Sequence, residues 1–216
     1  MRATFAHLLF LPTVAFNVLL CRILTMRRWW SFIDDGVLLG AAPFASDVPG
    51  LVSEGVTGVL NLCAEYVGPL DAYARAGIRQ HRLPTIDLTL PSLKDIRAGV
   101  AFIEEHVTRG ETVYVHCKSG RNRSATILLC WLIAAKGLAP REAQQWLQSR
   151  RPHVNRRLYQ RNVVQQFFAT YERPMAANEP HAPAADQTRD VEQPALELAG
   201  SLLSSHRLFG RRPYSS

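Results

Sequence analysis

"VYVHCKSGRNRSAT", residues 113–126, is the stretch that decides the fold of this chain. It opens with β-branched and aromatic residues, which favour a strand, and from Ser124 it continues into an apolar run of helical type. A strand that passes through a short loop into a helix is the basic unit of α/β folds. Ligands of such folds bind beyond the carboxyl ends of the strands, so the sequence predicts a ligand site at Cys117.

The same alternation of strand and helix patterns extends over residues 29–172. Short apolar runs bounded by turn residues predict strands, and apolar residues three and four positions apart predict helices. The expected strands are residues 36–40, 58–63, 78–84 and 112–117. The expected helices are residues 46–55, 69–77, 93–108, 124–136, 140–150 and 157–172. This alternation predicts an α/β domain with a mostly parallel central sheet flanked by helices.

The composition fits one domain with extensions. The chain has 216 residues, of which 47% are hydrophobic, so a sizeable core can be buried. The formal net charge is +7. A basic balance suggests an anionic partner, such as phosphate groups, lipid headgroups or nucleic acid.

The N-terminal segment, residues 1–28, differs from the domain that follows it. It contains no Asp or Glu, and arginines follow its apolar run at residues 8–21. This run is shorter than the ~20 residues that a spanning helix usually needs. We therefore expect the segment to lie on a membrane surface. The alternatives are a spanning helix, which would keep the rest of the chain cytoplasmic, and a helix packed on the domain.

The C-terminal segment, residues 173–216, is rich in Pro, Ala and charged residues and has few large apolar side chains. Such a composition predicts a disordered tail, because too little apolar surface is available to form a core. The alternative for the basic stretch at residues 202–213 is a segment that binds other molecules non-specifically.

The loop after Cys117 has the features of an anion-binding site. Several backbone N–H groups and the positive end of the following helix dipole face one position. Gly120 permits the tight turn, and Arg123 can fold back to bind two phosphate oxygens with its planar guanidinium group. The loop is therefore expected to hold a phosphate group directly beside the cysteine.

The same cations should turn Cys117 into a nucleophile. A free thiol has a pKa of about 8.5, and helix N-termini and neighbouring cations lower it to roughly 3.5–7.5. The hydroxyl of Ser124 can donate a hydrogen bond to the thiolate and ease its later departure. A thiolate below a bound phosphate suits phosphoryl transfer through a phosphocysteine intermediate.

An alkoxide leaving group needs a proton, so a general acid is expected. Asp87 lies in "LPTIDLTLPS", an extended stretch after a predicted strand, and is the preferred candidate. Asp71 and Asp95 lie in or near predicted helices and are weaker candidates. The alternative for Asp87 is a turn or cap residue.

The cysteines and histidines give no sign of a metal site. Cys21, Cys63, Cys117 and Cys130 are scattered, without metal-type spacing or a framework of pairs. We expect no metal, no cofactor and a reducing compartment. His116 is expected to orient the loop by a hydrogen bond rather than to act as a base.

The motif H-C-x5-R-S, here "HCKSGRNRS", resembles the signature of the cysteine-dependent dual-specificity phosphatases. The cysteine, glycine, arginine and serine of this motif all occupy family positions, and Asp87 matches the spacing of the family's general acid. The resemblance implies a dual-specificity-phosphatase-like fold that hydrolyses phosphoric monoesters.

Several further stretches resemble one branch, the protein-tyrosine-phosphatase-like mitochondrial phosphatidylglycerophosphate phosphatases and their bacterial relatives. These stretches are "LLFLPTVAFNVL", "WWSFIDDGVLLGAAP", "GVTGVLNLCAEY", "LPTIDLT" and "SRRPHV". The resemblance implies conversion of phosphatidylglycerophosphate to phosphatidylglycerol, a step toward cardiolipin. Glu65 and Tyr66 match a loop that flanks the family's pocket, whereas Cys63 and Ala64 depart from it.

The resemblance also implies that the loop residues Lys118, Ser119, Gly120, Arg121 and Asn122 bind substrate. Lys118 and Arg121 add two cations, which favours a multiply charged substrate such as a phospholipid, unless both point into solvent. Ser119 and Asn122 depart from the commonest family residues. With Asn122 in this position, the loop resembles that of the RNA triphosphatase branch. These departures are small, because the loop acts mainly through its backbone.

A second basic cluster lies near the end of the domain and can face either a membrane or bulk water. It consists of Arg150, Arg151, Arg156, Arg157 and Arg161. Near anionic lipid, each such charge contributes ~1 kcal/mol to membrane binding.

Three functions are compatible with the sequence. The preferred one is a phospholipid phosphatase that is membrane-associated, faces a bacterial cytoplasm or a mitochondrial matrix, and acts as a monomer without nucleic acid. The second is a dual-specificity protein tyrosine/serine/threonine phosphatase or an RNA 5′-phosphatase. The third is a non-catalytic phosphate-binding module, against which the intact Cys117, Arg123 and Asp87 argue.

Overall fold

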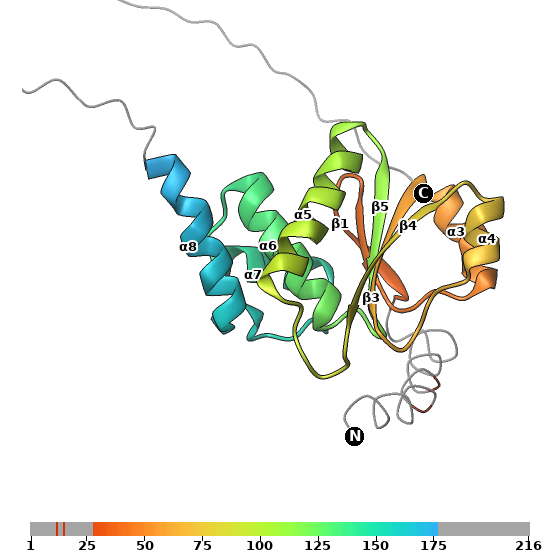
Figure 1. Cartoon of the computed structure of the whole chain (residues 1–216), viewed down its shortest axis with the longest axis horizontal. Helices are drawn as coiled ribbons and strands as arrows, with labels where there is room; N and C mark the ends of the chain where they lie inside the picture. The colour runs from red at the N-terminus through yellow and green to blue at the C-terminus, as the bar shows by residue number, and fades with distance from the viewer. Residues whose placement is uncertain (1–11, 13–14, 16–27, 177–216) are drawn as a thin grey trace, which may run out of the picture. The chain divides into compact units, whose positions relative to one another are not determined.

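The fold is described from a computed structural model, which describes residues 12, 15 and 28–176 (Figure 1). The predicted membrane association of residues 1–28 and the predicted disorder of residues 173–216 fall mostly on residues outside those described. Within the described range, every helix is too short or too polar to cross a membrane.

The centre of the domain is a five-stranded sheet in the order β1-β2-β5-β3-β4. The strands are β1 (Trp30–Asp34), β2 (Val37–Gly40), β3 (Val56–Cys63), β4 (Arg79–Thr85) and β5 (Thr112–His116). β1 pairs with β2 in antiparallel orientation, and all the other pairs are parallel. The predicted α/β fold with a mostly parallel sheet is confirmed.

Helices occur close to where the sequence predicts them. They are α3 (Val48–Ser53), α4 (Leu70–Arg75), α5 (Leu93–Thr108), α6 (Arg123–Lys136), α7 (Pro140–Arg150) and α8 (Asn162–Ala176), with 3-10 turns η2 (Ala45–Asp47) and η3 (Leu158–Gln160). The last helix begins five residues later than expected, because η3 occupies the preceding segment. It also continues past residue 172, where the tail was expected to begin.

The strand β1 was not predicted from the sequence. It is an edge strand in which only Ile33 is buried, so its apolar alternation is weak. The turn between β1 and β2 contains Asp35 and Gly36, and Gly36 has a φ of +71°. Asp-Gly between two strand-like runs is a strong hairpin signal, and it identifies β1 in retrospect.

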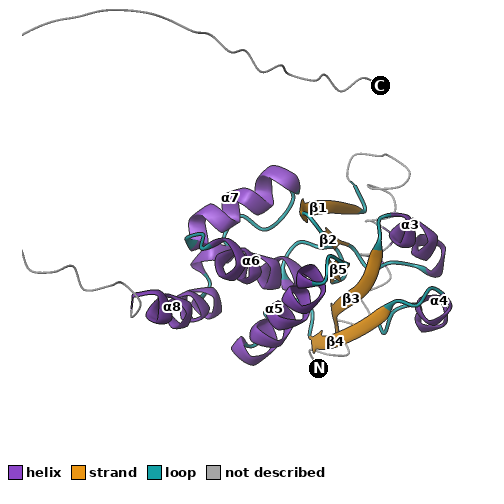
Figure 2. Cartoon of the chain, turned by 90° about the horizontal axis from the view of Figure 1, so that it is seen from above, coloured by secondary structure: helices purple, strands orange, loops and turns teal. Residues whose placement is uncertain are grey.

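Helices cover both faces of the sheet. Figure 2 shows α3 and α4 on one face and α5, α6, α7 and α8 on the other. The larger core cluster, which includes Leu60, Ile103 and Leu128, packs under the second set of helices. The smaller cluster includes Leu51 and Val59. Neighbouring residues of β3 thus belong to opposite cores, as expected for a strand of a parallel sheet that is buried on both sides.

Two helices hold the site in place. The α6 segment from Arg123 to Ile133 is buried throughout, which makes α6 the central helix of its layer. Helix α5 is capped by Ser92, whose hydroxyl accepts a hydrogen bond from the backbone N–H of Asp95 at 3.1 Å. A Cβ at Gly99 of α5 would lie 2.9 Å from the Ile127 side chain, so the absence of a side chain allows the close approach to α6.

Candidate active site

The loop of residues 117–123, which we call the cysteine loop, connects β5 to α6 at the carboxyl edge of the sheet. Gly120 has a φ of +67°, and a Cβ there would lie 2.6 Å from the carbonyl oxygen of Gly40. The predicted need for glycine is therefore both conformational and steric. The backbone N–H of Ala42 also donates to the Lys118 carbonyl at 3.3 Å, which ties the loop to the end of β2.

Cys117 is 2% exposed, and its sulfur accepts a hydrogen bond from the Ser124 hydroxyl at 3.2 Å. Burial alone would raise the pKa of the thiol. The charge of Arg123 and the hydrogen bonds from Ser124 and the backbone of Ser119 outweigh burial and lower the pKa of Cys117 to about 7. A substantial fraction of the thiol is therefore thiolate at neutral pH.

Arg123 lies beneath the loop and is 1% exposed. Its two terminal nitrogens donate to the two carboxylate oxygens of Glu65 at 2.7 and 2.8 Å, and one of them also donates to the Thr85 carbonyl at 2.8 Å. A bidentate carboxylate fixes the guanidinium plane. Glu65, which the resemblance placed beside the pocket, thus holds the orientation of Arg123.

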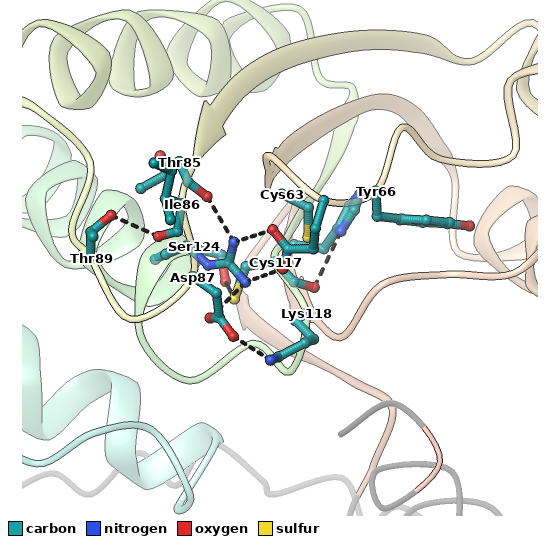
Figure 3. A network of polar contacts seen from close by, with 12 residues as sticks. Cys63, Tyr66, Thr85, Ile86, Asp87, Thr89, Cys117, Lys118 and Ser124 are labelled. Carbon is teal, nitrogen blue, oxygen red and sulfur yellow. Dashed lines mark hydrogen bonds and ion pairs between the residues drawn. The ribbon is translucent and has the colours of Figure 1, made fainter. Parts of the chain in front are cut away.

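Asp87 follows β4 and reaches the cysteine loop. Figure 3 shows its carboxylate turned toward the amine of Lys118, with which it forms a hydrogen-bonded ion pair. Its other oxygen lies 3.0 Å from an Arg123 nitrogen. Partial burial pushes the pKa of Asp87 upward, but the Lys118 hydrogen bond and the charges of Arg123 and Lys118 outweigh it and hold the pKa below its ordinary value. These two cations favour the anionic form of Asp87.

The other two candidate acids lie elsewhere. Asp71 is an exposed residue in the first turn of α4. Asp95 accepts a hydrogen bond from the Ser92 hydroxyl at 2.6 Å and belongs to the cap of α5. Of the three acids considered, Asp87 is the one that contacts Arg123.

Tyr66 and the outer part of the loop serve other contacts. The Tyr66 hydroxyl donates to the Pro43 carbonyl at 2.6 Å. Arg121 donates to the His153 carbonyl at 3.0 Å, and the Asn122 side chain accepts from Asn155 at 2.8 Å. Lys118 is buried and faces Asp87, whereas Arg121 is exposed and turns toward the segment after α7.

His116 is fully buried, and its Nδ1 lies 3.4 Å from the Cys117 carbonyl oxygen. This contact agrees with the predicted role in orienting the loop. Burial lowers the pKa of His116 to about 3. The imidazole is therefore neutral and does not act as a base at neutral pH.

The burial of Arg151 was not predicted from the sequence. The residue was expected in a basic surface cluster, but it is 1% exposed. It donates to the carbonyls of Ser119 and Gly120 at 3.4 and 3.3 Å and to those of Arg28 and Trp29 at 3.2 and 3.3 Å. These acceptors come from segments distant in sequence, which is why charge patterning alone could not place the residue.

Asn61 was also missed by the sequence analysis. It is fully buried in β3, accepts a hydrogen bond from the Cys63 backbone N–H at 2.8 Å and donates to the Tyr66 carbonyl at 3.0 Å. Both bonds shape the loop that carries Glu65. The amide side chain of Asn61 within the apolar run of residues 58–63 was the sequence feature that could have indicated a structural role.

The site combines a partly ionised thiol, a helix N-terminus and a fixed guanidinium. The side chain of Asn122, the residue before α6, makes no capping hydrogen bond, so the first N–H groups of the helix stay available to an anion. Within the described residues, no group of three His, Cys, Asp or Glu side chains could hold a metal ion. This arrangement defines a cysteine-dependent phosphatase site.

The comparisons identify the same class. The model of the dual specificity phosphatase catalytic domain matches residues 37–169. Phosphatidylglycerophosphate phosphatase PTPMT2 of Arabidopsis thaliana is 40% identical over 164 residues, which cover 74% of this chain and 72% of the relative. Phosphatidylglycerophosphatase and protein-tyrosine phosphatase 1 of Mus musculus is 36% identical over 176 residues, which cover 77% of this chain and 91% of the relative.

A solved structure agrees with these relatives. The crystal structure of PTPMT1 matches with a TM-score of 0.64 and 36% identity, over 69% of this chain and 100% of that one. The chain therefore belongs to the dual specificity phosphatase family, and it is a phosphoric monoester hydrolase.

Proposed function

We propose that the chain hydrolyses the terminal phosphomonoester of phosphatidylglycerophosphate and releases phosphatidylglycerol. The observation that carries the proposal is the pairing of a cysteine phosphatase site with a 40% identical relative named for this reaction. Arg121, which is exposed in the cysteine loop, adds positive charge that suits an anionic lipid headgroup.

In the first step of the proposed reaction, the Cys117 thiolate forms a bond to phosphorus. The bond from phosphorus to the glycerol oxygen breaks, and Asp87 gives its proton to that oxygen. Arg123 and the N–H groups of the loop hold the equatorial phosphate oxygens and stabilise the charge that develops on them.

In the second step, water attacks the phosphocysteine. The Asp87 carboxylate accepts a proton from this water, the new P–O bond forms, and the S–P bond breaks. The Ser124 hydroxyl, 3.2 Å from the sulfur, stabilises the departing thiolate. Inorganic phosphate leaves, and the starting thiolate is restored.

In this scheme, substrate binding favours the protonated form of Asp87. The Asp87 carboxylate is paired with Lys118 and Arg123. A phosphate dianion that takes over Arg123 removes one of these partners and adds a like charge nearby. Both changes raise the pKa of Asp87, so the carboxylate takes up a proton from solvent and becomes the general acid.

The proposal extends to the surroundings of the enzyme. We infer membrane association through residues 1–28 and a monomeric catalytic domain that faces a reducing compartment. Cys63, Cys117 and Cys130 are free, which supports that compartment.

The deciding experiment supplies the purified protein with four substrates under matched conditions: phosphatidylglycerophosphate, a phosphoinositide, a phosphotyrosine peptide and a 5′-phosphorylated RNA. We expect the highest kcat/KM on phosphatidylglycerophosphate. Higher turnover of the peptide or the RNA would overturn the proposal. Cys117→Ser should abolish turnover of every substrate while it retains phosphate affinity, because a hydroxyl is a poor nucleophile and the loop stays intact.

A further inference from the structure

An arginine-lined cavity lies beside the cysteine loop, outside the group of residues around Cys117. Its volume is about 870 Å³, and four exposed arginines line it: Arg28, Arg121, Arg150 and Arg156. No Asp or Glu is among its described lining residues. None of these four arginines forms an ion pair with a residue in the described part of the chain.

The cavity wall and the cysteine loop form one connected framework. The backbone N–H of Asn155 donates to the Arg121 carbonyl at 3.0 Å, and the Asn155 side chain donates to Asn122 at 2.8 Å. Beneath them, buried Arg151 binds carbonyls of the same loop. The arginines are thus carried on a fixed backbone, which lowers the entropy lost when a ligand binds.

Two of the arginines are also held by their neighbours. Arg121 donates through Nε to the His153 carbonyl at 3.0 Å. The Arg150 guanidinium lies 3.9 Å from the centre of the Trp146 ring. These contacts fix the planes of the two guanidinium groups, whose geometry matches the oxygens of a phosphate.

The position of the cavity relates it to the substrate. Arg121 and Asn122 line it and also belong to the loop that begins at the nucleophile. Phosphatidylglycerophosphate carries two phosphates joined through one glycerol unit. When the terminal monoester lies above Cys117, the phosphodiester lies within one glycerol unit of it, and the cavity begins at Arg121 and Asn122 of the same loop.

We propose that this cavity is a second anion-binding site that takes the phosphodiester group of an anionic phospholipid. The proposal rests on the proposed lipid phosphatase function. The diester belongs either to the substrate molecule itself or to a neighbouring lipid in the membrane. The chemistry is the same in both cases: one negative phosphate between guanidinium groups.

The test compares the double variant Arg150→Gln/Arg156→Gln with a control, Arg75→Gln/Arg141→Gln. Both change the net charge by the same amount, and Arg75 and Arg141 are exposed residues that do not line the cavity. Rates are measured on an aryl phosphate, on short-chain phosphatidylglycerophosphate below its micellar concentration, and on vesicles of phosphatidylcholine with phosphatidylglycerol that contain the substrate. Vesicle flotation of both variants in the Cys117→Ser background measures binding without turnover.

If the substrate's own diester binds, the cavity variant raises KM for the short-chain lipid by about 10-fold or more, because at least one of the two substituted arginines loses a charge-assisted hydrogen bond to it. If a neighbouring lipid binds, only the vesicle rate and flotation fall, and the loss grows with the phosphatidylglycerol content. In both cases the aryl phosphate rate stays unchanged.

The inference is overturned if the cavity and control variants agree in every lipid assay and in flotation. It is also overturned if the aryl phosphate rate falls by the same factor as the lipid rate, because the arginines would then only support the loop. A wild-type protein that leaves the short-chain lipid intact contradicts the proposed function instead, and flotation then still decides whether the cavity binds lipid.

Discussion

At the scale of single residues, Cys117 shows how opposing effects set reactivity. Burial disfavours the thiolate, and the charge of Arg123 with three hydrogen bonds favours it, so the pKa of Cys117 falls to about 7. Cys130, which is equally buried but lacks such partners, has its pKa raised by burial alone. The comparison shows that the cation and the donors, rather than burial, create the nucleophile.

The Ser124 hydrogen bond can be tested by titration. Alkylation of Cys117 by iodoacetamide, followed by peptide mapping, should show a half-maximal rate near pH 7 in the wild type. Ser124→Ala removes a donor to the thiolate and should raise this midpoint by about one pH unit. A midpoint that does not move would contradict the role of Ser124.

Asp87 is expected to act on the leaving group. Asp87→Asn should slow hydrolysis of alkyl phosphates, lipids included, by roughly 10²–10⁴. An aryl phosphate should be affected much less, because its leaving group scarcely needs a proton. Steady-state rates on both substrates provide the measurement, and equal losses would exclude Asp87 as the acid.

Lys118 tunes this acid. It favours the charged form of Asp87, so Lys118→Gln should raise the pKa of Asp87. A higher pKa keeps the acid protonated to higher pH, and the alkaline limb of kcat for the lipid should move to higher pH. Arg121→Gln, which removes a loop cation without a contact to Asp87, is the control. An unmoved limb in Lys118→Gln would count against the pairing.

At the scale of elements, the sequence predicted most of the fold because the patterns are local. Three such patterns depend on neighbouring residues only: the apolar run of β3, the helical spacing of apolar residues in α5, and the strand-loop-helix sequence around Cys117. Cys117, Arg123 and Ser124 could be found from one motif for the same reason. Edge strand β1 was not predicted, because its burial pattern lacks a clear alternation.

What the sequence could not give are contacts between distant segments. The bidentate hold of Glu65 on Arg123 joins residues 58 positions apart, and Lys118 and Asp87 are 31 apart. Arg151 binds Trp29 across 122 positions. A buried arginine and a surface arginine look alike in a basic stretch, and only the folded arrangement distinguishes them.

The contacts of Arg151 predict that this residue stabilises the cysteine loop. Arg151→Lys keeps the charge but loses the planar group that reaches several carbonyls at once. Each buried acceptor left without a partner costs about 1–3 kcal/mol, so the free energy of unfolding should fall by about that much or more. Urea denaturation measures this, and kcat/KM on an aryl phosphate should fall as well. Arg150→Lys, at the exposed neighbouring position, should change neither, and equal behaviour of the two variants would contradict the role of Arg151.

At the scale of the whole molecule, a lipid phosphatase faces a problem that a soluble phosphatase does not have, because its substrate cannot leave the bilayer. We propose that the cysteine loop, the arginine-lined cavity and the N-terminal segment each contribute to a solution of this problem. The carbonyls of Arg28 and Trp29, where that segment ends, bind Arg151 beneath the loop. The chain entering from the N-terminal segment is thus attached directly to the catalytic framework.

The N-terminal segment is predicted to deliver the domain to the membrane without a part in the chemistry. Its sequence has an apolar run followed by arginines, whose charge favours anionic headgroups. Removal of residues 1–26 keeps the Arg28 and Trp29 carbonyls, so hydrolysis of a soluble aryl phosphate should stay nearly unchanged. Hydrolysis of vesicular lipid and flotation with liposomes should fall, most steeply on anionic vesicles at low salt, where electrostatic attraction contributes most to binding of the full-length chain. Full activity and flotation of the truncated protein would refute the anchor, and loss of folding in urea titrations would place residues 8–21 in the core instead.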